Sequence, residues 1–292
     1  MTLLAVPNIS EGRESAVVRS IGRAFERAHA RLLDVHVDPD HHRSVFTLAG
    51  EPGSLAYAVL EGARVALSRI DLATHEGGHP RVGAIDVAPI VYPAEEMRGA
   101  ACAEALVLGD LLAQELGLPT FLYGELAGGR TRAELRAGGL AGLRERIAAG
   151  QLSPDFGPGD LDPHKGAVLV AARAPLVAFN VELSPEATLE QAREIAALIR
   201  DGGAEALAGV RAIGVWLDQR GCAQVSMNVE DPATRLVEVL AAVRRHAEVG
   251  GAELVGLAPR ATLEGFPADV ELRGRNVLEE ALAQERVRDH LS

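Results

Sequence analysis

The residues best suited to proton transfer lie in residues 74–87, whose sequence is THEGGHPRVGAIDV. This stretch brings His75, His79, an acid, an arginine and three glycines together directly before an apolar run. A histidine with an ordinary pKa near about 6.5 can take up and return a proton near neutral pH, which contributes on the order of 10²–10⁴ in rate. Glycines let the backbone pass close to a ligand, and Pro80 restricts the chain after His79. From the residues alone, a catalytic role and a purely structural role for these imidazoles are both open.

Residues 75–79 also match the HExxH pattern of zinc proteases. That pattern forms a zinc site only when both histidines lie on one face of a continuous helix. Gly77 and Gly78 within the pattern and Pro80 after it disfavour a helix. We therefore expect a loop without a metal site, and a metal-dependent hydrolase that uses this histidine pair stays an alternative function.

A second polar cluster, HVDPDHHR, occupies residues 36–43 between two predicted strands. It could bind a metal, position a substrate or form a solvated turn, and the solvated turn is the simplest interpretation. Arg43 and Arg81 are the natural partners for a carboxylate, because a guanidinium group matches that geometry with two hydrogen bonds. Either arginine could instead pair with a neighbouring acid.

The elements that must position these residues follow one order twice: strand, helix, strand, strand, helix, strand. In the first half we expect strands at 3–7, 31–37, 44–50 and 84–92, with helices at about 12–28 and 52–68. In the second half we expect strands at 166–183, 210–218, 222–230 and 252–259, with helices ending near 200 and 249. The segment between the halves, residues 93–150, adds a helix at about 94–116, a strand at 119–124 and a further helical stretch.

This pattern predicts an α/β fold (more narrowly α+β) with two related split βαβ-type subdomains, residues 1–165 and 166–292. Each would have a mostly antiparallel sheet with helices on one face. Residues 153–166, SPDFGPGDLDPHKG, are too rich in Gly, Pro and Asp for a helix or strand, so we expect a boundary loop there. Because ligands commonly bind where domains meet, we expect a ligand cleft between the subdomains.

The composition bounds the class of protein. The 292 residues are 48% hydrophobic and 24% charged, which is typical of a globular protein, and no apolar run reaches the roughly 18 residues of a membrane helix. A net charge of −12 argues against nucleic acid as the main partner. The N-terminus lacks the features of a signal peptide, and Cys102 and Cys222 are expected as reduced thiols. We therefore expect a soluble, cytoplasmic protein without a membrane partner.

The chain resembles glutamate formimidoyltransferase. The resemblance covers essentially the whole chain, and it rests on the following motifs, which occur in order along the sequence: VPNISEGR (6–13), LLDVHVDPDHHRSVFTLAG (32–50), HEGGHPRVGAIDVAPIVY (75–92), PTFLYGE (119–125), PDFGP (154–158) and VAFNVEL (177–183). Motifs of this length and number are highly specific, whereas a single HPR would not be.

The resemblance implies transfer of the formimidoyl group of N-formimidoyl-L-glutamate to N5 of tetrahydrofolate, in histidine breakdown and one-carbon metabolism. It implies that His79 is the catalytic histidine and that the protein pairs as a homodimer. The folate-contacting stretch aligns with Gly157, Pro158, Gly159, Asp160, Leu161, Asp162, Pro163, His164, Lys165 and Gly166. Lys165, the only lysine of the chain, would then lie beside the pterin or the glutamyl tail.

Two positions depart from the family pattern. His36 stands where the vertebrate proteins carry an acid thought to assist catalysis, so Asp34 or Asp38 could substitute, or His36 could act itself. His42 stands where those proteins have an asparagine. The chain also stops where a cyclodeaminase domain would begin, so we expect no cyclodeaminase activity.

The expected reaction needs no metal and no covalent intermediate. His79 would remove the N5 proton as the new bond forms and return it to the departing glutamate nitrogen, while Arg43 or Arg81 holds the carboxylates of the donor. Asn8, in the loop after the first strand, could hydrogen-bond the donor. Besides the metal-dependent hydrolase, two alternatives stay open: formyl transfer between 5-formyltetrahydrofolate and glutamate, and folate binding without catalysis.

Overall fold

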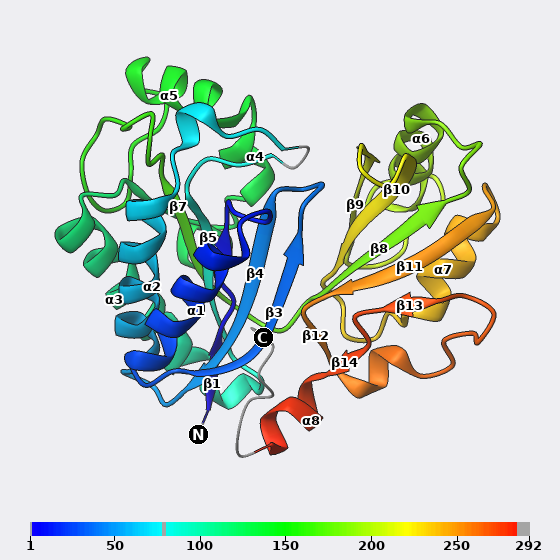
Figure 1. The fold of residues 1–292 in the computed structure, drawn as a ribbon, viewed down its shortest axis with the longest axis horizontal. Helices are drawn as coiled ribbons and strands as arrows, with labels where there is room; N and C mark the ends of the chain where they lie inside the picture. The colour runs from blue at the N-terminus through cyan, green and yellow to red at the C-terminus, as the bar shows by residue number, and fades with distance from the viewer. Residues whose placement is uncertain (1, 78–79, 285–292) are drawn as a thin grey trace. The chain divides into compact units, whose positions relative to one another are not determined.

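The structure, a computed structural model, describes residues 2–77 and 80–284. These residues form two compact units, and the chain passes from one to the other between Ala174 and Pro175 (Figure 1). Among the described residues, no helix is both long and apolar enough to cross a bilayer. Both Cys102 and Cys222 are free thiols.

The first unit is built around a sheet with a split βαβ topology. Its central elements are β1 (Leu3–Ala5), β2 (Asn8–Ile9), α1 (Ser15–Arg27), β3 (Arg31–Asp38), β4 (Arg43–Gly50), α2 (Leu55–Arg69) and β5 (Ile85–Val91). β1 and β2 both pair with β4 and with β5, so they act as one strand that is interrupted at Val6 and Pro7. A proline has no N–H to donate to a strand ladder, which explains the interruption.

The strand directions show the split arrangement twice. α1 joins the first strand to β3, which runs parallel to it, and the antiparallel β4 lies between them. α2 joins β4 to β5 in the same way, and the β1/β2 strand lies between those two. The predicted split βαβ pattern of the first half is therefore confirmed.

This sheet is extended beyond β5. β7 (Val168–Arg173) pairs with β5 and β6 (Thr120–Leu122) pairs with β7, both in parallel. The remaining helices of the unit are α3 (Arg98–Leu116), α4 (Arg132–Arg136) and α5 (Gly139–Ala148), with short 3₁₀ turns η1 (Leu72–Thr74), η2 (Glu95–Met97) and η3 (Gly124–Ala127).

The second unit repeats the topology. Its main elements are β8 (Val177–Leu183), α6 (Leu189–Ile199), β9 (Val210–Leu217), β10 (Cys222–Val229), α7 (Leu236–Arg244) and β11 (Val249–Val255). The sheet order is β13-β11-β8-β10-β9, in which β8 is antiparallel to both β10 and β11. The unit ends with β12 (Leu257–Ala258), η4 (Arg260–Leu263), β13 (Leu272–Arg273), β14 (Asn276–Val277) and α8 (Leu278–Ala283). The predicted internal repeat is confirmed.

The boundary between the two units lies after Ala174, whereas the sequence predicted it after residue 165. The expected single strand at 166–183 consists of two strands, β7 in the first unit and β8 in the second. Ala174, Pro175 and Leu176 separate them, and the proline cannot continue a ladder. Residues 166–174 therefore belong to the first unit, and the loop at 153–166 lies within that unit instead of at its boundary.

Each sheet buries one face under helices. In the first unit, Phe25 of α1 packs edge-on against Phe46 of β4 with ring centroids 5.2 Å apart, in a core that α2 and α3 complete. In the second unit, Phe179 and Val181 of β8 face the core under α6 and α7. The first unit also has a smaller apolar cluster on its other face, where α4 and α5 cover β5, β6 and β7. The further helical stretch predicted between the halves is confirmed by α4 and α5, but its position on this second face was not predicted.

Two glycines bring the loop before β5 against the start of β7. Gly83 and Gly166 form an antiparallel bridge, and a Cβ on Gly83 would lie 1.8 Å from the Ala167 carbonyl oxygen. Gly166 has a φ of +74°, and a Cβ there would lie 2.1 Å from the Val82 carbonyl oxygen. Only residues without a side chain permit this approach.

We predict that Gly83→Ala lowers the free energy of unfolding by about 1–3 kcal/mol, because the new methyl group must displace backbone atoms. The urea midpoint of the purified protein measures this loss. Gly99→Ala in α3 is the matched control, because a Cβ there meets open space. Equal midpoints for the two variants would contradict the predicted close approach.

Candidate active site

Three of the predicted substrate-binding residues lie on one face of the first sheet. His36 of β3 pairs with Val45 of β4, and Val45 pairs on its other side with Asn8 of β2. Side chains directly opposite each other in neighbouring strands point to the same face, and Arg43 shares that face because it lies two residues before Val45. Phe46, the residue after Val45, is buried in the core beneath the helices. Asn8, His36 and Arg43 therefore lie on the face of the sheet opposite that core.

Strand polarity brings several loops to the same edge of this sheet. β2 and β3 end there, and β4, β5 and β7 begin there. The loops at 10–14, 38–43, 80–84 and 157–167 therefore meet at one edge, although they are far apart in sequence.

The turn between β3 and β4 is an ordered structure. The Asp38 carboxylate accepts a hydrogen bond from the His41 backbone N–H at 2.8 Å, and both residues are buried. His42 follows with a φ of +48°, in the left-handed region that non-glycine residues seldom adopt. The interpretation of this cluster as a solvated turn is therefore wrong, since buried hydrogen bonds fix its shape.

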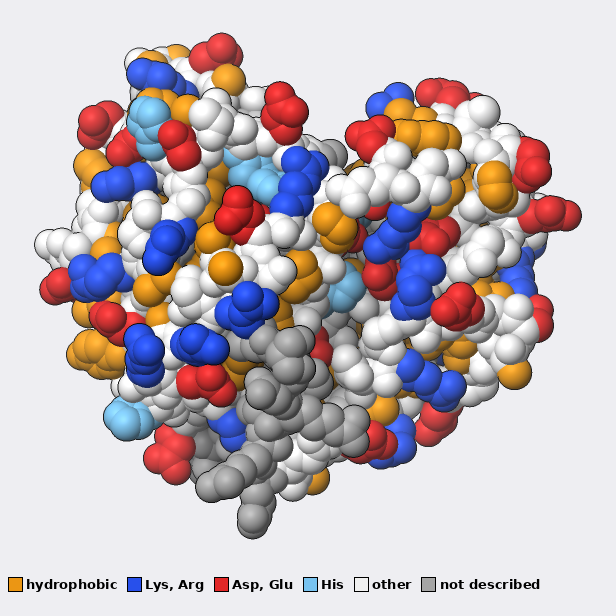
Figure 2. All heavy atoms as spheres, in the orientation of Figure 1, with side chains coloured by type: hydrophobic (Ala, Val, Ile, Leu, Met, Phe, Trp, Pro, Cys, Tyr) orange, Lys and Arg blue, Asp and Glu red, His pale blue; other side chains and the backbone are white. Residues whose placement is uncertain are grey.

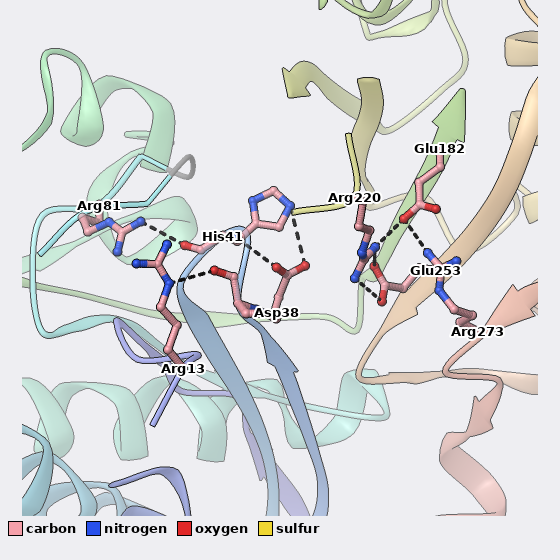
Figure 3. A network of polar contacts seen from close by, with 9 residues as sticks. Arg13, Asp38, His41, Arg81, Glu182, Arg220, Glu253 and Arg273 are labelled. Carbon is pink, nitrogen blue, oxygen red and sulfur yellow. Dashed lines mark hydrogen bonds and ion pairs between the residues drawn. The ribbon is translucent and has the colours of Figure 1, made fainter. Parts of the chain in front are cut away.

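Two glycines allow neighbouring loops to pack on this turn. A Cβ on Gly12 would lie 2.2 Å from the Asp38 carbonyl oxygen, and a Cβ on Gly77 would lie 2.9 Å from the His41 carbonyl oxygen. Arg81 also binds the turn, donating from Nη2 to the His41 carbonyl at 3.0 Å (Figure 3). Residues 75–77 are not helical, which confirms the expected loop and excludes the helical zinc-protease geometry.

His79, the predicted catalytic residue, lies outside the residues that the structure describes, as does Gly78. The described residues on either side show where the segment is anchored. Gly77 packs on the hairpin turn, and the side chain of Arg81 binds that turn. The assignment of His79 as the catalytic residue stays a prediction.

A chain of polar contacts runs through these loops. The Glu11 carboxylate accepts hydrogen bonds from the backbone N–H groups of Arg13 at 2.7 Å and Glu14 at 2.9 Å. Its Oε1 lies 3.5 Å from Nε2 of His42, and Nδ1 of His42 contacts Nε2 of His75. Nη1 of Arg81 lies 2.6 Å from Nδ1 of His75.

Both imidazoles in this chain favour the neutral form. Burial, with help from Arg81 and His42, lowers the pKa of His75 to about 4. Burial also lowers the pKa of His42, although Glu11 acts in the opposite direction. Burial acts to raise the pKa of Glu11, but the backbone N–H groups of Glu14 and Arg13 hold that pKa below its usual value. At neutral pH the group therefore consists of two neutral rings between a carboxylate and a guanidinium ion.

A buried carboxylate lies beside this group. Asn8 pairs with Val87 but the next residue, Ile9, pairs with Ile85, so Asp86 is the additional residue of a β-bulge in β5. Its carboxylate accepts the Val82 backbone N–H at 2.8 Å.

Three arginines interact with the charge of the Asp86 carboxylate. It forms an ion pair with Arg136 at the end of α4. Burial and then Arg136 lower the pKa of Arg43 to about 10, while Asp86 and Asp38 act to raise it. Burial lowers the pKa of Arg81 as well, and Asp86 again acts to raise it. Asp86 thus pairs with Arg136 and also favours the charged forms of Arg43 and Arg81.

Sequence reasoning missed Asp86, Arg136 and Glu11. Asp86 did carry a signal, because it is the one charged residue in the apolar run AIDVAPIVY (84–92). A single acid in a buried strand needs a partner. Arg136 carried no such signal, since it ends a five-residue helix that packs on the sheet only in the folded chain.

The predicted folate-binding stretch, residues 157–166, is anchored at both ends in the first unit. Gly157 has a φ of +88°, and a Cβ there would lie 2.7 Å from the Leu118 carbonyl oxygen. At the other end the Lys165 carbonyl accepts the Ala84 backbone N–H at 2.9 Å. This end of the stretch is therefore adjacent to the loop that carries Arg81.

Within the stretch, Asp162 organises the last turn. Its side chain accepts the His164 backbone N–H at 2.9 Å, and its carbonyl accepts the Gly166 backbone N–H at 2.8 Å. Nζ of Lys165 lies 4.0 Å from the Asp162 carboxylate, and half of the lysine side chain is exposed. An exposed ion pair of this length is weak, so the lysine can exchange this partner for a ligand carboxylate at little cost.

The second unit has its own polar network on the sheet face opposite α6 and α7. The Glu182 carboxylate forms an ion pair with Arg220 and accepts Nη2 of Arg273 at 2.5 Å (Figure 3). Nη1 of Arg220 lies 3.3 Å from Glu253. Burial acts to lower the pKa of Arg220, but the two glutamates raise it above its usual value. Two arginines and two glutamates balance one another here.

Surface charge agrees with the composition. Basic and acidic side chains are interspersed over the face drawn in Figure 2. That face therefore carries no continuous basic surface of the kind that nucleic acid requires.

We predict that Asp86→Asn lowers the free energy of unfolding by about 3–5 kcal/mol, because it removes the charge that pairs with the largely buried Arg136. Urea denaturation measures the loss. Glu95→Gln is the control, since its ion pair with Arg98 at 3.2 Å is exposed and should contribute less than about 1 kcal/mol. A loss for Asp86→Asn no larger than that of the control would contradict the predicted role.

We also predict that stability falls as the pH drops from about 6.5 towards 4. The folded-state pKa of His75 is about 4, below the value near 6.5 of an unfolded chain, so the unfolded state binds more protons in this window. His75 thus stabilises the fold fully only above its unfolded pKa. Thermal midpoints across this range should fall less steeply for His75→Gln than for the wild type. Identical slopes would contradict the lowered pKa of His75.

Comparison with known proteins identifies the family. Residues 2–173 match the model of the formiminotransferase domain, N-terminal subdomain, and residues 178–277 match that of the formiminotransferase domain. The chain is 39% identical to formimidoyltransferase-cyclodeaminase of Sus scrofa, over 87% of this chain and 49% of that protein. It is 37% identical to glutamate formimidoyltransferase of Streptococcus pyogenes serotype M1, over 88% and 89% of the two chains. It is 35% identical to the protein of that name from Thermoplasma acidophilum, over 88% of each.

The chain spans about half the length of the formimidoyltransferase-cyclodeaminases that it matches, and nearly the full length of the two glutamate formimidoyltransferases. The first family model matches the first structural unit and the second model matches the second unit. The boundary between the two matches, between residues 173 and 178, lies close to Pro175. The chain therefore belongs to the formiminotransferase family.

Proposed function

We propose that this chain is a glutamate formimidoyltransferase, which moves the formimidoyl group of N-formimidoyl-L-glutamate to N5 of tetrahydrofolate. The observation that carries the proposal is its likeness to two proteins named glutamate formimidoyltransferase, each over 88% of this chain. The arginine group around Asp86 agrees with it, because the donor is a dicarboxylate and guanidinium groups bind carboxylates well.

In the proposed mechanism, N5 of tetrahydrofolate attacks the formimidoyl carbon and a tetrahedral intermediate forms. The bond from that carbon to the glutamate nitrogen then breaks and releases glutamate. His79 takes the N5 proton and returns it to the departing nitrogen. Holding the two substrates together can by itself supply up to about 7–11 kcal/mol of the barrier.

Arg43 and Arg81 bind the donor carboxylates in this proposal, and Asn8 and His36 face the donor from the same side of the sheet. This arrangement is supported by the shared sheet face of Asn8, His36 and Arg43. Of the groups that could replace the family acid, Asp38 is engaged in the hairpin turn. Asp34, His36 and Asp38 alternate along β3 and so share one face of the sheet, and each stays a candidate for this role.

Residues 157–166 would bind tetrahydrofolate, with Lys165 complementing a carboxylate of its glutamyl tail. This assignment is supported by the contact between the end of this stretch and residues 82–84, next to Arg81. The resemblance further implies a homodimer in the cytoplasm, which we include in the proposal. The proposed reaction uses tetrahydrofolate as a co-substrate.

We predict that the purified protein transfers the formimidoyl group of N-formimidoyl-L-glutamate to tetrahydrofolate. Mass spectrometry of the folate product and of glutamate measures this transfer. His79→Ala should fold as the wild type does and lose about 10²–10⁴-fold in kcat, the contribution of general acid–base catalysis.

Parallel assays distinguish the alternatives. If the protein turns over only 5-formyltetrahydrofolate and glutamate, the reaction is formyl transfer and not formimidoyl transfer. Loss of activity with chelators, and its return with a metal, would favour the hydrolase. Tight tetrahydrofolate binding without transfer to or from any donor would indicate a folate-binding protein, and wild-type rates for His79→Ala would remove His79 from the mechanism.

A further inference from the structure

Arg13 is an exposed arginine at the edge of the first sheet where the loops meet. Its side chain donates from Nε to the Pro39 carbonyl at 3.1 Å. Among the residues that the structure describes, Arg13 forms no ion pair, whereas Arg98 and Arg136 of the same unit each pair with a carboxylate. A guanidinium group that binds no acid of its own chain can bind an acidic ligand without first losing a partner.

The backbone at Arg13 is fixed on the turn between β3 and β4. The Glu11 carboxylate accepts the Arg13 backbone N–H at 2.7 Å. A Cβ on Gly12 would lie 2.2 Å from the Asp38 carbonyl oxygen and 2.5 Å from the Arg43 backbone nitrogen, so this loop and the turn are in direct contact. Because the backbone and Nε of Arg13 are both held, ordering its side chain on a ligand costs less entropy than for a typical exposed arginine.

The two nearest acids have other partners. The Glu11 carboxylate accepts two backbone N–H groups, and its Oε1 lies 3.5 Å from Nε2 of His42. The Asp38 carboxylate accepts the backbone N–H of His41 at 2.8 Å within the turn. Both carboxylates therefore stabilise the backbone of the site, and neither forms an ion pair with Arg13 among the described residues.

A second guanidinium group binds the same turn. Nη2 of Arg81 donates to the His41 carbonyl at 3.0 Å, and Arg13 donates to the Pro39 carbonyl two residues earlier. Figure 3 shows both guanidinium groups on the same side of the turn. Burial lowers the pKa of Arg81, Asp86 acts to raise it, and the charge of Arg13 lowers it again. The two positive charges are thus close enough to repel each other, and an anion bound between them would relieve that repulsion.

The chemistry of the guanidinium group indicates the kind of anion. Nε of Arg13 is used by the Pro39 carbonyl, so Nη1 and Nη2 are the groups that can donate two parallel hydrogen bonds to one carboxylate. Both substrates of the proposed reaction carry carboxylates: the donor has two, and tetrahydrofolate has those of its glutamyl tail. A carboxylate is therefore the ligand that this position fits.

We propose that Arg13 is a further substrate-binding residue: its guanidinium group, held over the β3–β4 turn by the Pro39 carbonyl, binds a substrate carboxylate beside Arg81. The identity of the substrates rests on the proposed function, whereas binding of a carboxylate at Arg13 does not.

Three variants test the charge and the shape of this group. Arg13→Gln removes the charge, and Arg13→Lys keeps the charge but loses the planar pair of donors. Arg23→Gln is the matched control, because it removes the same charge from an exposed position well inside α1. The bond to Pro39 is exposed, so we expect the thermal midpoints of all three variants to stay close to that of the wild type.

The first test is independent of the reaction. Isothermal titration calorimetry at pH 7 uses L-glutamate and 5-formyltetrahydrofolate as probes, which carry the carboxylates of the donor and of the folate. Arg13→Gln should weaken the binding of one probe by about 10–100-fold, the range of a hydrogen bond to a charged group. Arg13→Lys should lose less affinity than Arg13→Gln, and Arg23→Gln should lose none.

The probe that loses affinity identifies the source of the carboxylate. A loss confined to L-glutamate assigns Arg13 to the donor, and a loss confined to 5-formyltetrahydrofolate assigns it to the glutamyl tail. Unchanged Kd values for both probes in Arg13→Gln, or no binding of either probe by the wild type, would overturn the proposal. Wild-type affinity in Arg13→Lys would contradict the two parallel hydrogen bonds.

The second test uses turnover. In Arg13→Gln, KM for the same substrate should rise by about 10–100-fold while kcat changes much less, because a residue that binds the ground state and the transition state alike affects mainly KM. A fall in kcat with both KM values unchanged would contradict a binding role. If the wild type transfers no formimidoyl group, the proposed function is rejected, and the calorimetric result still decides whether Arg13 binds a carboxylate.

Discussion

The buried carboxylate of Asp86 is the charge on which the candidate site depends. Arg43, Arg81 and Arg136 come from three different segments; Asp86 forms an ion pair with Arg136 and acts to raise the pKa values of the other two. The proposed site for the donor carboxylates lies at this group of arginines, because guanidinium ions bind carboxylates well.

The topology explains why the polar loops gather there. In a split βαβ unit, the strands that leave the sheet at one edge and the strands that enter it there alternate, so the connections between distant segments share that edge. Gly12, Gly77, Gly83 and Gly166 then let these connections approach at backbone distance. The second unit repeats the topology but not the chemistry, because its two arginines are matched by Glu182 and Glu253. The polar network of the second unit therefore differs from the group around Asp86, although the two units share a topology.

Much of the fold was predictable from local patterns. The order of strands and helices and the internal repeat follow from apolar periodicity and from turn residues, and the structure confirms both. The loop at residues 75–77 followed from the glycines and Pro80. The division near residue 165 differed from the structural one because a glycine- and proline-rich segment was taken as a boundary. Such a segment can also be a loop with both ends anchored in one sheet, as residues 157–166 are.

The sequence by itself determined the types of element, the doubled order and the set of reactive side chains, because these depend on residues that are close along the chain. Only the tertiary structure decided which of these side chains share a site. Strand register placed His36 and Asn8 on one face, a β-bulge placed Asp86 among arginines, and a left-handed turn brought His42 to His75. The contact between His42 and His75 joins residues 33 positions apart, and the geometry of the site depends on how the strands pair, a property that no local pattern contains.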